Sequence, residues 1–498
     1  MNKAILIFSI FLLMLAVNAG TISAKNQHSD FPATPLGIIA KEWVDAINQG
    51  DEAALRSFIE NRFSSFALKN QNPDSLLTLF RNLQKQGGGI EVVRFSPNKG
   101  ELPMEIIIKS KNGNRFANVI IGLNEKEGKL AGIGIRKIEN PEDQNWARGV
   151  LTEREMIDEI KRQVAKSAEN GDFSGVVLVA KDDKILLNEA YGYADREAKI
   201  PNTTKTGFHL ASVGKMFTSA AIAKLVKAGK ISYTDTVAKI LPDYPNRDIA
   251  QKVTIHHLLT HTAGMGTFFQ SPGFDRKIKY HNAAEEIAVY QDEPLFFEPG
   301  ARWRYSNAGY SLLSAIIERV SGKTYLEYIR ENVLKPLKMN DTDTNTNDIP
   351  AKNAAVLYQP TEVDPFGLEP LQADRGILTA QANGFGGGFS TATDLYKFAR
   401  AFRTGNLLGQ ESIETLVAPK IPAQANQTSG YGIYERIVNG ETVRGHSGGG
   451  RADVAILWNS GYIVVVQVNV IPTTAASVSG KIVDFITKQE SLRKKRAD

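Results

Sequence analysis

A serine and a lysine stand three residues apart at the start of an apolar segment. Ser212-Val213-Gly214-Lys215 opens a stretch whose spacing predicts a buried helix that ends near Gly229, with apolar residues Met216, Phe217, Ala220, Ala221, Ile222 and Leu225. One helical turn brings the Ser212 hydroxyl and the Lys215 amine onto one face. A serine becomes nucleophilic when a base removes its proton, and a lysine is such a base only where its charge is suppressed. If Lys215 is the base for Ser212, the fold must therefore bury this lysine beside the serine.

The tetrapeptide alone leaves two interpretations open. A serine often caps a helix and a nearby lysine is commonly solvated, so the pattern also fits an ordinary surface helix. Two later segments favour the chemical interpretation, since a motif gains meaning from its context.

A tyrosine and an asparagine follow a Pro-Gly turn in the segment 298–310. Tyr305 precedes Asn307 by two positions, and the apolar residues from Leu312 onward predict a helix that begins near Tyr310. A tyrosine hydroxyl can carry a proton, and an asparagine amide both donates and accepts hydrogen bonds. The plain alternative is a loop tyrosine with Asn307 as the cap of the next helix.

The third segment, Gly445-His446-Ser447-Gly448-Gly449-Gly450, separates strand-like stretches at 441–444 and 453–458. Glycines let a substrate lie close to the backbone, where N–H groups can stabilise a developing oxyanion. The plain alternative is a hairpin turn. The three segments in this order indicate nucleophilic catalysis by a serine.

With these segments the chain resembles the serine β-lactamase and penicillin-binding protein superfamily, in its branch of class C β-lactamases, D-alanyl-D-alanine carboxypeptidases and esterases. That superfamily carries Ser-x-x-Lys, Tyr-x-Asn and then Lys-Thr-Gly or His-x-Gly, and the matching residues are Ser212, Lys215, Tyr305, Asn307, His446 and Gly448. Segments 257–265, 299–325 and 386–394 match the family's general run. The resemblance covers residues 150–490. It implies an α+β fold, with an antiparallel sheet flanked by helices and a helical subdomain.

The resemblance implies a secreted serine hydrolase that acts through an acyl-enzyme. Ser212 would be acylated, Lys215 would act as its general base or help to form it, and Tyr305 would carry the proton to the leaving group. The backbone N–H groups of Ser212 and Gly449 would form the oxyanion hole. A helix N-terminus suits this role, because free N–H groups and the helix dipole favour negative charge there.

The resemblance also implies how a substrate would bind. Asn307 would hold the acyl-side amide, and His446, Ser447 and Gly448 would contact the substrate. β-Lactamases usually have a lysine where His446 stands, and a neutral imidazole weakens the attraction for a substrate carboxylate. Arg451, just beyond, could supply a cation instead. Hydrolysis of a D-alanyl peptide, an ester or a β-lactam stays open, in that order of preference.

These residues also fit other functions and other chemistries. The alternative function is a non-catalytic penicillin-binding-like receptor for a cell-wall or other envelope ligand, which an intact but unreactive Ser212 would reveal. A Ser-His-Asp triad with His446 and Asp453 is the rival chemistry, but Ser212 lies outside a Gly-x-Ser-x-Gly elbow. His257 and His261 are four residues apart, yet the zinc-protease glutamate and any cysteine are missing, so we predict no metal and no cofactor.

The N-terminus predicts export. Lys3 precedes an apolar run at 4–17 and small residues at 19–24, which is typical of a cleaved signal peptide over 1–24. The chain has no cysteine, so it can form no disulfide. Because a secreted protein without disulfides is ordinary in bacteria, we expect a periplasmic or extracellular bacterial protein.

Residues 34–140 are predicted to form a separate α+β domain. Its expected helices are at 38–47, 52–59 and 74–86, and its expected strands are at 90–95, 104–109, 116–123 and 129–137. Helices followed by an antiparallel sheet resemble the small cone-shaped domains of the nuclear transport factor 2-like (NTF2-like) superfamily. A polar, proline-bearing linker follows at 141–152.

The serine hydrolase domain is expected over 153–490. A helix at 153–168 and a hairpin at 176–187 precede a helical middle, strand patterns return only after Gly430, and a helix from 475 to 489 closes the domain. Strands at both ends imply one antiparallel sheet built from both termini of the domain.

A basic tail at 491–498 carries much of the net charge of +5. We expect it to be solvated or to contact an anionic envelope surface weakly. No platform for nucleic acid is present, so the expected partner is a small-molecule or peptide or ester substrate. The sequence does not predict the oligomeric state.

Overall fold

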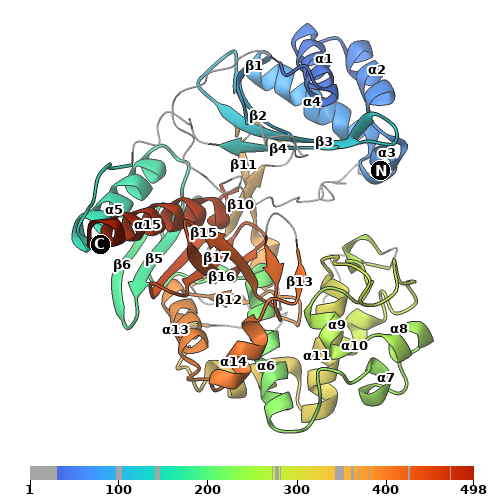
Figure 1. The fold of residues 1–498 in the computed structure, drawn as a ribbon, viewed down its shortest axis with the longest axis vertical. Helices are drawn as coiled ribbons and strands as arrows, with labels where there is room; N and C mark the ends of the chain where they lie inside the picture. Colours follow the sequence, from blue (N-terminus) through green and yellow to red (C-terminus); the bar gives the residue numbers. More distant parts are fainter. Residues whose placement is uncertain are drawn as a thin grey trace. The chain divides into compact units, whose positions relative to one another are not determined.

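The computed structural model describes residues 31–96, 104–138, 140, 146–271, 273–274, 280, 282–342, 353–360, 364–367, 370–379, 381–423, 427–471 and 473–497. Within these ranges the chain divides into two compact units. The first contains the described residues up to Trp146 together with Tyr358–Gln372, and the second contains Ala147–Leu357 and the residues from Ala373 onward (Figure 1). The predicted signal peptide at 1–24 and most of the first half of the predicted linker lie outside the described residues.

The first unit consists of helices followed by an antiparallel sheet. The helices are α1 (Pro35–Gln49), α2 (Glu52–Arg62), α3 (Ser65–Asn70) and α4 (Pro73–Gly87). The strands lie side by side in chain order, β1 (Ile90–Ser96), β2 (Met104–Ser110), β3 (Phe116–Asn124) and β4 (Lys129–Ile138). Every predicted helix and strand of this region is confirmed, and α3 is the one that the sequence pattern missed.

The core of the first unit is aromatic and includes a residue from far along the chain. Trp43 and Phe58 contact Phe80 edge to face, with ring centroids 6.1 Å apart in both pairs. Phe366 is fully buried in the same cluster. A Cβ atom added to Gly87 would lie 2.6 Å from the Phe366 ring, so glycine makes room for that ring. The NTF2-like resemblance of this unit stays a prediction.

The second unit is built on an eight-stranded antiparallel sheet. Its order is β13-β14-β15-β16-β17-β18-β5-β6, so strands from both ends of the unit meet where β18 pairs with β5. The bounds are β13 (Ile421–Pro422), β14 (Thr428–Ser429), β15 (Tyr434–Val438), β16 (Glu441–Gly448), β17 (Ala452–Leu457), β18 (Tyr462–Val468), β5 (Gly175–Lys181) and β6 (Lys184–Tyr191). The predicted α+β class and the joining of both termini are confirmed.

The prediction that strands return only after Gly430 is wrong. β13 and β14 join the main sheet before that residue. Short pairs also form from β7 (Tyr193–Asp195) with β8 (Ile200–Pro201), β9 (Phe208–His209) with β12 (Phe389–Ser390), and β10 (Leu357–Pro360) with β11 (Leu371–Asp374). Strands of two to four residues are too short to show the alternation from which strands are predicted.

Helices cover both faces of the central strands. Val176, Leu178 and Ala180 alternate along β5 and belong to one core cluster with residues of α6 (Gly214–Lys227) and α13 (Ala392–Thr404). The opposite face of β17 and β18 packs on α15 (Ala475–Ala497), which also contacts α5 (Glu153–Glu169) (Figure 1). Burial on both faces explains why β17 and β18 are buried at every position.

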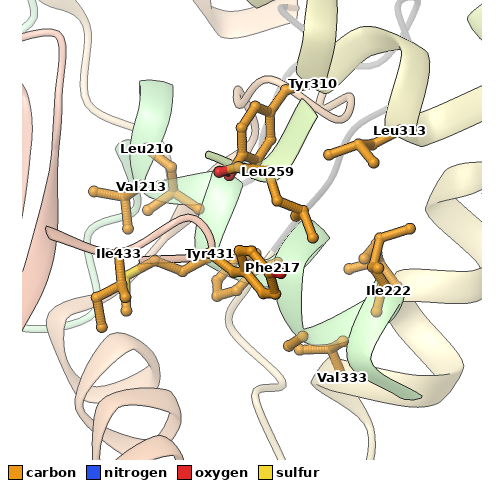
Figure 2. Close-up of a cluster of buried hydrophobic side chains, with 14 of the residues drawn as sticks. Leu210, Val213, Phe217, Ile222, Leu259, Tyr310, Leu313, Val333, Tyr431 and Ile433 are labelled. Atoms are coloured by element: carbon orange, nitrogen blue, oxygen red, sulfur yellow. The ribbon is translucent and has the colours of Figure 1, made fainter. Parts of the chain in front are cut away.

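The rest of the second unit is largely helical and surrounds α6. Figure 2 shows part of this core, in which Phe217 and Ile222 of α6 lie among Leu259, Leu313 and Tyr431. The remaining helices are α7 (Val237–Ile240), α8 (Arg247–Lys252), α9 (Ile255–Leu259), α10 (Ala283–Ile287), α11 (Asn307–Ser321), α12 (Tyr325–Ile329) and α14 (Gln410–Val417), with short turns η1 (Ala211–Val213), η2 (Phe268–Gln270), η3 (Arg330–Leu334) and η4 (Arg375–Thr379).

The basic segment near the C-terminus is helical. Helix α15 runs past the predicted domain end at 490 to Ala497. Arg493 donates to the carbonyl oxygen of Leu151 at 2.9 Å and pairs with Glu490 at 2.6 Å, so this arginine is held by the protein. Contact of the segment with an envelope surface stays a prediction. Over the described ranges, every helix is too short or too polar to cross a bilayer.

The aromatic core of the first unit predicts a distant mutational effect. Phe366→Ala removes a buried ring and should lower the free energy of unfolding of the first unit by about 3–5 kcal/mol. Hydrogen exchange of β1–β4 in the full chain measures this loss. Phe296→Ala is the control, because the Phe296 ring is half exposed in the second unit. Equal protection of β1–β4 in both variants would contradict the assignment of Phe366 to that core.

Candidate active site

A strained turn presents Ser212 at the start of α6. Ser212 lies in η1, and the preceding Ala211 has a left-handed backbone with φ 45°. Ala211 donates its N–H to Nδ1 of His209 at 3.2 Å, and its carbonyl accepts from the N–H of Gly387 at 3.1 Å. A left-handed alanine costs free energy and persists only where neighbours fix it, as they do here. The turn therefore holds the serine in one defined position.

Two groups reach the Ser212 hydroxyl. The Tyr305 hydroxyl donates to Ser212 Oγ at 2.7 Å, and Lys215 Nζ lies 3.2 Å from the same oxygen. The predicted placement of serine and lysine on one helical face is confirmed. The predicted helix is confirmed as well, although a short 3₁₀ turn carries the serine and α6 begins at Gly214.

Lys215 is fully buried among neutral groups. Its Nζ donates to Asn307 Oδ1 at 2.8 Å and to the Phe385 carbonyl oxygen at 2.6 Å. The Tyr305 ring centroid lies 4.8 Å from the same nitrogen. In the described part of the chain no carboxylate is within ion-pair distance of it, and burial lowers the pKa of Lys215 well below its usual value. A neutral amine beside a serine hydroxyl can accept its proton.

Tyr305 and Asn307 are set by the start of α11. The helix begins at Asn307, three residues before the predicted start at Tyr310, and its cap is Ser306, whose Oγ accepts from Gly309 N–H at 2.9 Å. The alternative in which Asn307 caps the helix is therefore wrong. Its amide instead reaches Lys215 and donates to Thr267 Oγ1 at 3.2 Å. Burial raises the pKa of Tyr305, which keeps its hydroxyl protonated.

His261 accepts two hydrogen bonds from the segment that contains Tyr305. Its Nδ1 accepts from Ser306 N–H at 3.1 Å, and its carbonyl accepts from Arg304 N–H at 2.8 Å. The other two histidines of this region have their own contacts: His257 forms a capping box with Thr254, and His256 Nδ1 lies 2.7 Å from the Tyr431 hydroxyl. Among the described residues, no three histidine, aspartate or glutamate side chains gather as metal ligands would.

Residues Gly445 to Gly448 of the third segment form the end of strand β16, and Gly449 and Gly450 lie in the hairpin turn that leads to β17. β15 pairs with β16 only as far as Tyr434 opposite Gly445, so His446, Ser447 and Gly448 pair with β17 alone. One edge of these three residues is therefore free of a neighbouring strand. The chain turns only afterwards, at Gly449 with φ 48°.

Gly448 lies directly against the nucleophile turn. A Cβ atom there would be 2.0 Å from the Leu210 carbonyl oxygen and 3.1 Å from the Ser212 nitrogen. A Cβ on Gly449 would be 3.3 Å from the Ala211 side chain. The backbone of Gly448 and Gly449 therefore packs against the turn that contains Ser212.

The polar side chains of this strand point to different partners. Burial, and next the charge of Lys215, lower the pKa of His446 to about 3, so its imidazole is neutral. Its Nδ1 lies 2.7 Å from the Ser447 carbonyl oxygen. The Ser447 hydroxyl donates to Asp453. Asp453 therefore engages Ser447 rather than orienting His446, and a Ser-His-Asp triad does not form.

The structure brings Ser212, Lys215, Tyr305 and Asn307 into direct contact, with the end of β16 beside them. Sequence reasoning missed the contributions of His209, Thr267 and Phe385. The one sequence signal for this region is the glycine run at 386–388, which is typical of a backbone that lies close to another. In the structure, a Cβ on Gly386 would lie 2.2 Å from the Ala211 carbonyl oxygen. The arrangement suits acyl transfer to a serine, since it combines a hydroxyl, an amine whose pKa burial lowers and a second proton carrier.

Comparisons with known proteins place the chain in a family. The family described as Beta-lactamase matches residues 160–483. Penicillin-binding protein 4* of Bacillus subtilis is 31% identical over 296 residues, which are 56% of this chain and 64% of that protein. The putative penicillin-binding protein PbpX of the same organism is 29% identical over 269 residues, covering 53% of this chain and 62% of that protein. The matched part of the chain thus spans less than two thirds of each relative.

A solved structure extends the likeness to the fold. The penicillin-binding protein from Bacillus halodurans superimposes with a TM-score of 0.55 and 28% identity, over 65% of this chain and 99% of that chain.

The close approach at Gly448 predicts a severe effect of one methyl group. Gly448→Ala should displace β16 from the Ser212 turn and lower Ser212-dependent ester hydrolysis at least about 100-fold, as misplaced reacting groups do. Gly480→Ala is the control, because a Cβ there meets nothing within 4 Å. Equal rates in the two variants, measured with p-nitrophenyl acetate, would show that the approach has no part in the reaction.

Proposed function

Because the chain belongs to the Beta-lactamase family, we propose that it is a serine hydrolase that forms an acyl-enzyme on Ser212. The observation that carries the proposal is the buried Lys215 amine, whose pKa burial lowers and which lies 3.2 Å from the Ser212 hydroxyl that Tyr305 also contacts. A lysine so placed has little structural purpose, since a buried amine without an ion pair costs stability. Its value lies in its basicity at neutral pH.

The proposed reaction has two halves. In the first, Lys215 accepts the hydroxyl proton while Ser212 Oγ bonds to the substrate carbonyl carbon. The bond to the leaving group then breaks as Tyr305 gives its proton to that group, and Lys215 passes the serine proton on to Tyr305. In the second, a water molecule attacks the acyl carbon and gives one proton to the pair of Lys215 and Tyr305. The bond from the acyl carbon to Ser212 Oγ then breaks, that proton passes to Ser212 Oγ, and the carboxylic acid is released. Both halves pass through an oxyanion.

The substrate contacts follow from the same geometry. The N–H groups of Ser212 and Gly449 would stabilise the oxyanion, and one such donor is worth about 2.7–4 kcal/mol in the transition state. Asn307 would hold the acyl-side amide through its Nδ2, which now contacts Thr267. An extended substrate would lie along the free edge of His446 to Gly448, where backbone groups can pair with it.

The neutral charge of His446 guides the choice of substrate. An imidazole with a pKa of about 3 carries no cation for a substrate carboxylate at neutral pH. Because a histidine at this position also occurs in the peptidase and esterase branches of the family, we propose D-alanyl peptides first, esters second and β-lactams third. We also propose that the chain is exported by the signal peptide at 1–24, which lies outside the described residues.

Acylation of Ser212 is the direct test of the proposal. Brief incubation of the signal-free protein with a penicillin, and separately with p-nitrophenyl acetate, should give an adduct or turnover that Ser212→Ala abolishes. Ser219→Ala is the matched control, because Ser219 is a buried serine two turns along the same helix. Intact-mass spectrometry reads the adduct. An intact Ser212 that reacts with neither compound would favour the non-catalytic receptor for an envelope ligand.

A charge change at position 446 tests the choice of substrate. His446→Lys adds a cation where the wild type has a neutral imidazole, so acylation by a penicillin, which bears a carboxylate, should rise about 10-fold relative to hydrolysis of p-nitrophenyl acetate. The ratio of the two rates, measured at several ionic strengths, is the readout. A ratio unchanged from the wild type would show that position 446 does not face the substrate carboxylate.

A further inference from the structure

A buried carboxyl lies beside the candidate active site without a role in the proposed reaction. Glu286 of α10 is 6% exposed. Its Oε2 accepts from the Ser311 hydroxyl at 2.7 Å, and its Oε1 accepts from Asn383 Nδ2 at 2.6 Å. No lysine or arginine of the described ranges pairs with it. Burying a carboxyl group without a cationic partner costs free energy. The hydrogen bonds that Ser311 and Asn383 donate offset part of this cost, and the carboxyl group holds both donors in place.

Asn383 opens a tight turn that ends at Gly386. The two residues exchange backbone hydrogen bonds, from Asn383 N–H at 2.8 Å and from Gly386 N–H at 3.1 Å. Asn383 Oδ1 accepts from the Phe385 N–H at 3.2 Å. One amide side chain is thus fixed at one end by Glu286 and at the other by the turn itself.

The same turn touches the catalytic groups on two sides. The Phe385 carbonyl oxygen accepts from Lys215 Nζ at 2.6 Å. A Cβ on Gly386 would lie 2.2 Å from the Ala211 carbonyl oxygen and 3.1 Å from the Ser212 nitrogen. A small movement of the turn would therefore alter both the acceptor of the lysine and the backbone of the serine.

We propose that Glu286 is a positioning residue for the Ser212 reaction: its carboxylate clamps Asn383 and so holds the Phe385 carbonyl against Lys215. The proposal rests on the proposed function, in which Lys215 is the base. Glu286 touches neither the substrate nor a reacting atom. It acts on Lys215 through two hydrogen bonds, one from Asn383 to Glu286 and one from Lys215 to the Phe385 carbonyl oxygen.

The clamp is sensitive to pH near neutrality. Burial raises the pKa of Glu286 to about 7. The ionisable groups that influence Glu286 or are influenced by it are Glu285, Glu318, Tyr290 and Tyr325, and the two tyrosines stay protonated because burial raises their pKa values. Above pH 7 the carboxylate accepts a charge-assisted bond from Asn383, and below it the neutral acid accepts a weaker one. Turnover should therefore fall on the acid side with an inflection that belongs to Glu286.

Glu286→Gln tests the clamp, because it keeps the size of the side chain and removes its charge. We expect kcat for p-nitrophenyl acetate to fall about 10-fold with KM within about twofold, and the inflection near neutral pH to vanish. Glu318→Gln is the matched control, since this neighbouring half-buried carboxylate accepts from Tyr325 N–H and does not touch the turn. Circular dichroism of both variants verifies the fold.

A second measurement does not depend on turnover. Nitrogen-15 NMR of Lys215 Nζ should give a lower pKa in Glu286→Gln than in the wild type, because a displaced Phe385 carbonyl stabilises the ammonium form less. An unchanged pKa of Lys215 overturns the proposal, whether or not the wild type hydrolyses the ester. A lowered pKa in a protein without Ser212-dependent hydrolysis would refute the proposed function and still support the clamp.

Discussion

Removing the amine of Lys215 from water costs free energy that only hydrogen-bond acceptors or loss of its proton can offset. The structure provides hydrogen-bond acceptors for the amine and surroundings that favour loss of its proton. Asn307 and the Phe385 carbonyl oxygen accept from the nitrogen, while no carboxylate of the described residues contacts it to hold the proton. A single carboxylate in that place would turn the lysine into a permanent cation. Under the proposed mechanism, the neutrality of its surroundings is what allows the lysine to act as a base.

The neutral surroundings require backbones to come unusually close. Carbonyl oxygens and N–H groups can replace charged side chains only where no Cβ atom intervenes. Gly386 and Gly448 approach the Ser212 nitrogen so closely that a Cβ on either would lie 3.1 Å from it. The strained Ala211 lies between them with φ 45°. Glycine on each side thus permits the polar backbone that a buried lysine and an oxyanion both need.

The sequence predicted most helices and strands and a cluster that contains Ser212, Lys215 and Tyr305, and it failed where contacts join distant segments. The Ser212 and Lys215 spacing fixes a contact within one helical turn, so it could be predicted, whereas the Phe385 carbonyl contacts Lys215 across 170 positions and leaves no residue-type signal. The sequence did not predict Phe366 as a core residue for the same reason. A single aromatic residue in a long connection between elements has no hydrophobic periodicity around it. Ser447 was expected at the substrate, but the sequence could not show that Asp453 would engage its hydroxyl.

The charge at position 446 and the strength of the base are linked. Lys215 and His446 interact electrostatically, since the charge of Lys215 contributes to the low pKa of His446. By reciprocity, a cation at 446 would lower the pKa of Lys215 further and weaken it as a base. A neutral imidazole at position 446 therefore does not attract a substrate carboxylate, but it leaves the pKa of Lys215 higher than a cation at that position would. Under the proposed mechanism this arrangement suits amides and esters whose recognition depends on the backbone edge of β16 rather than on charge.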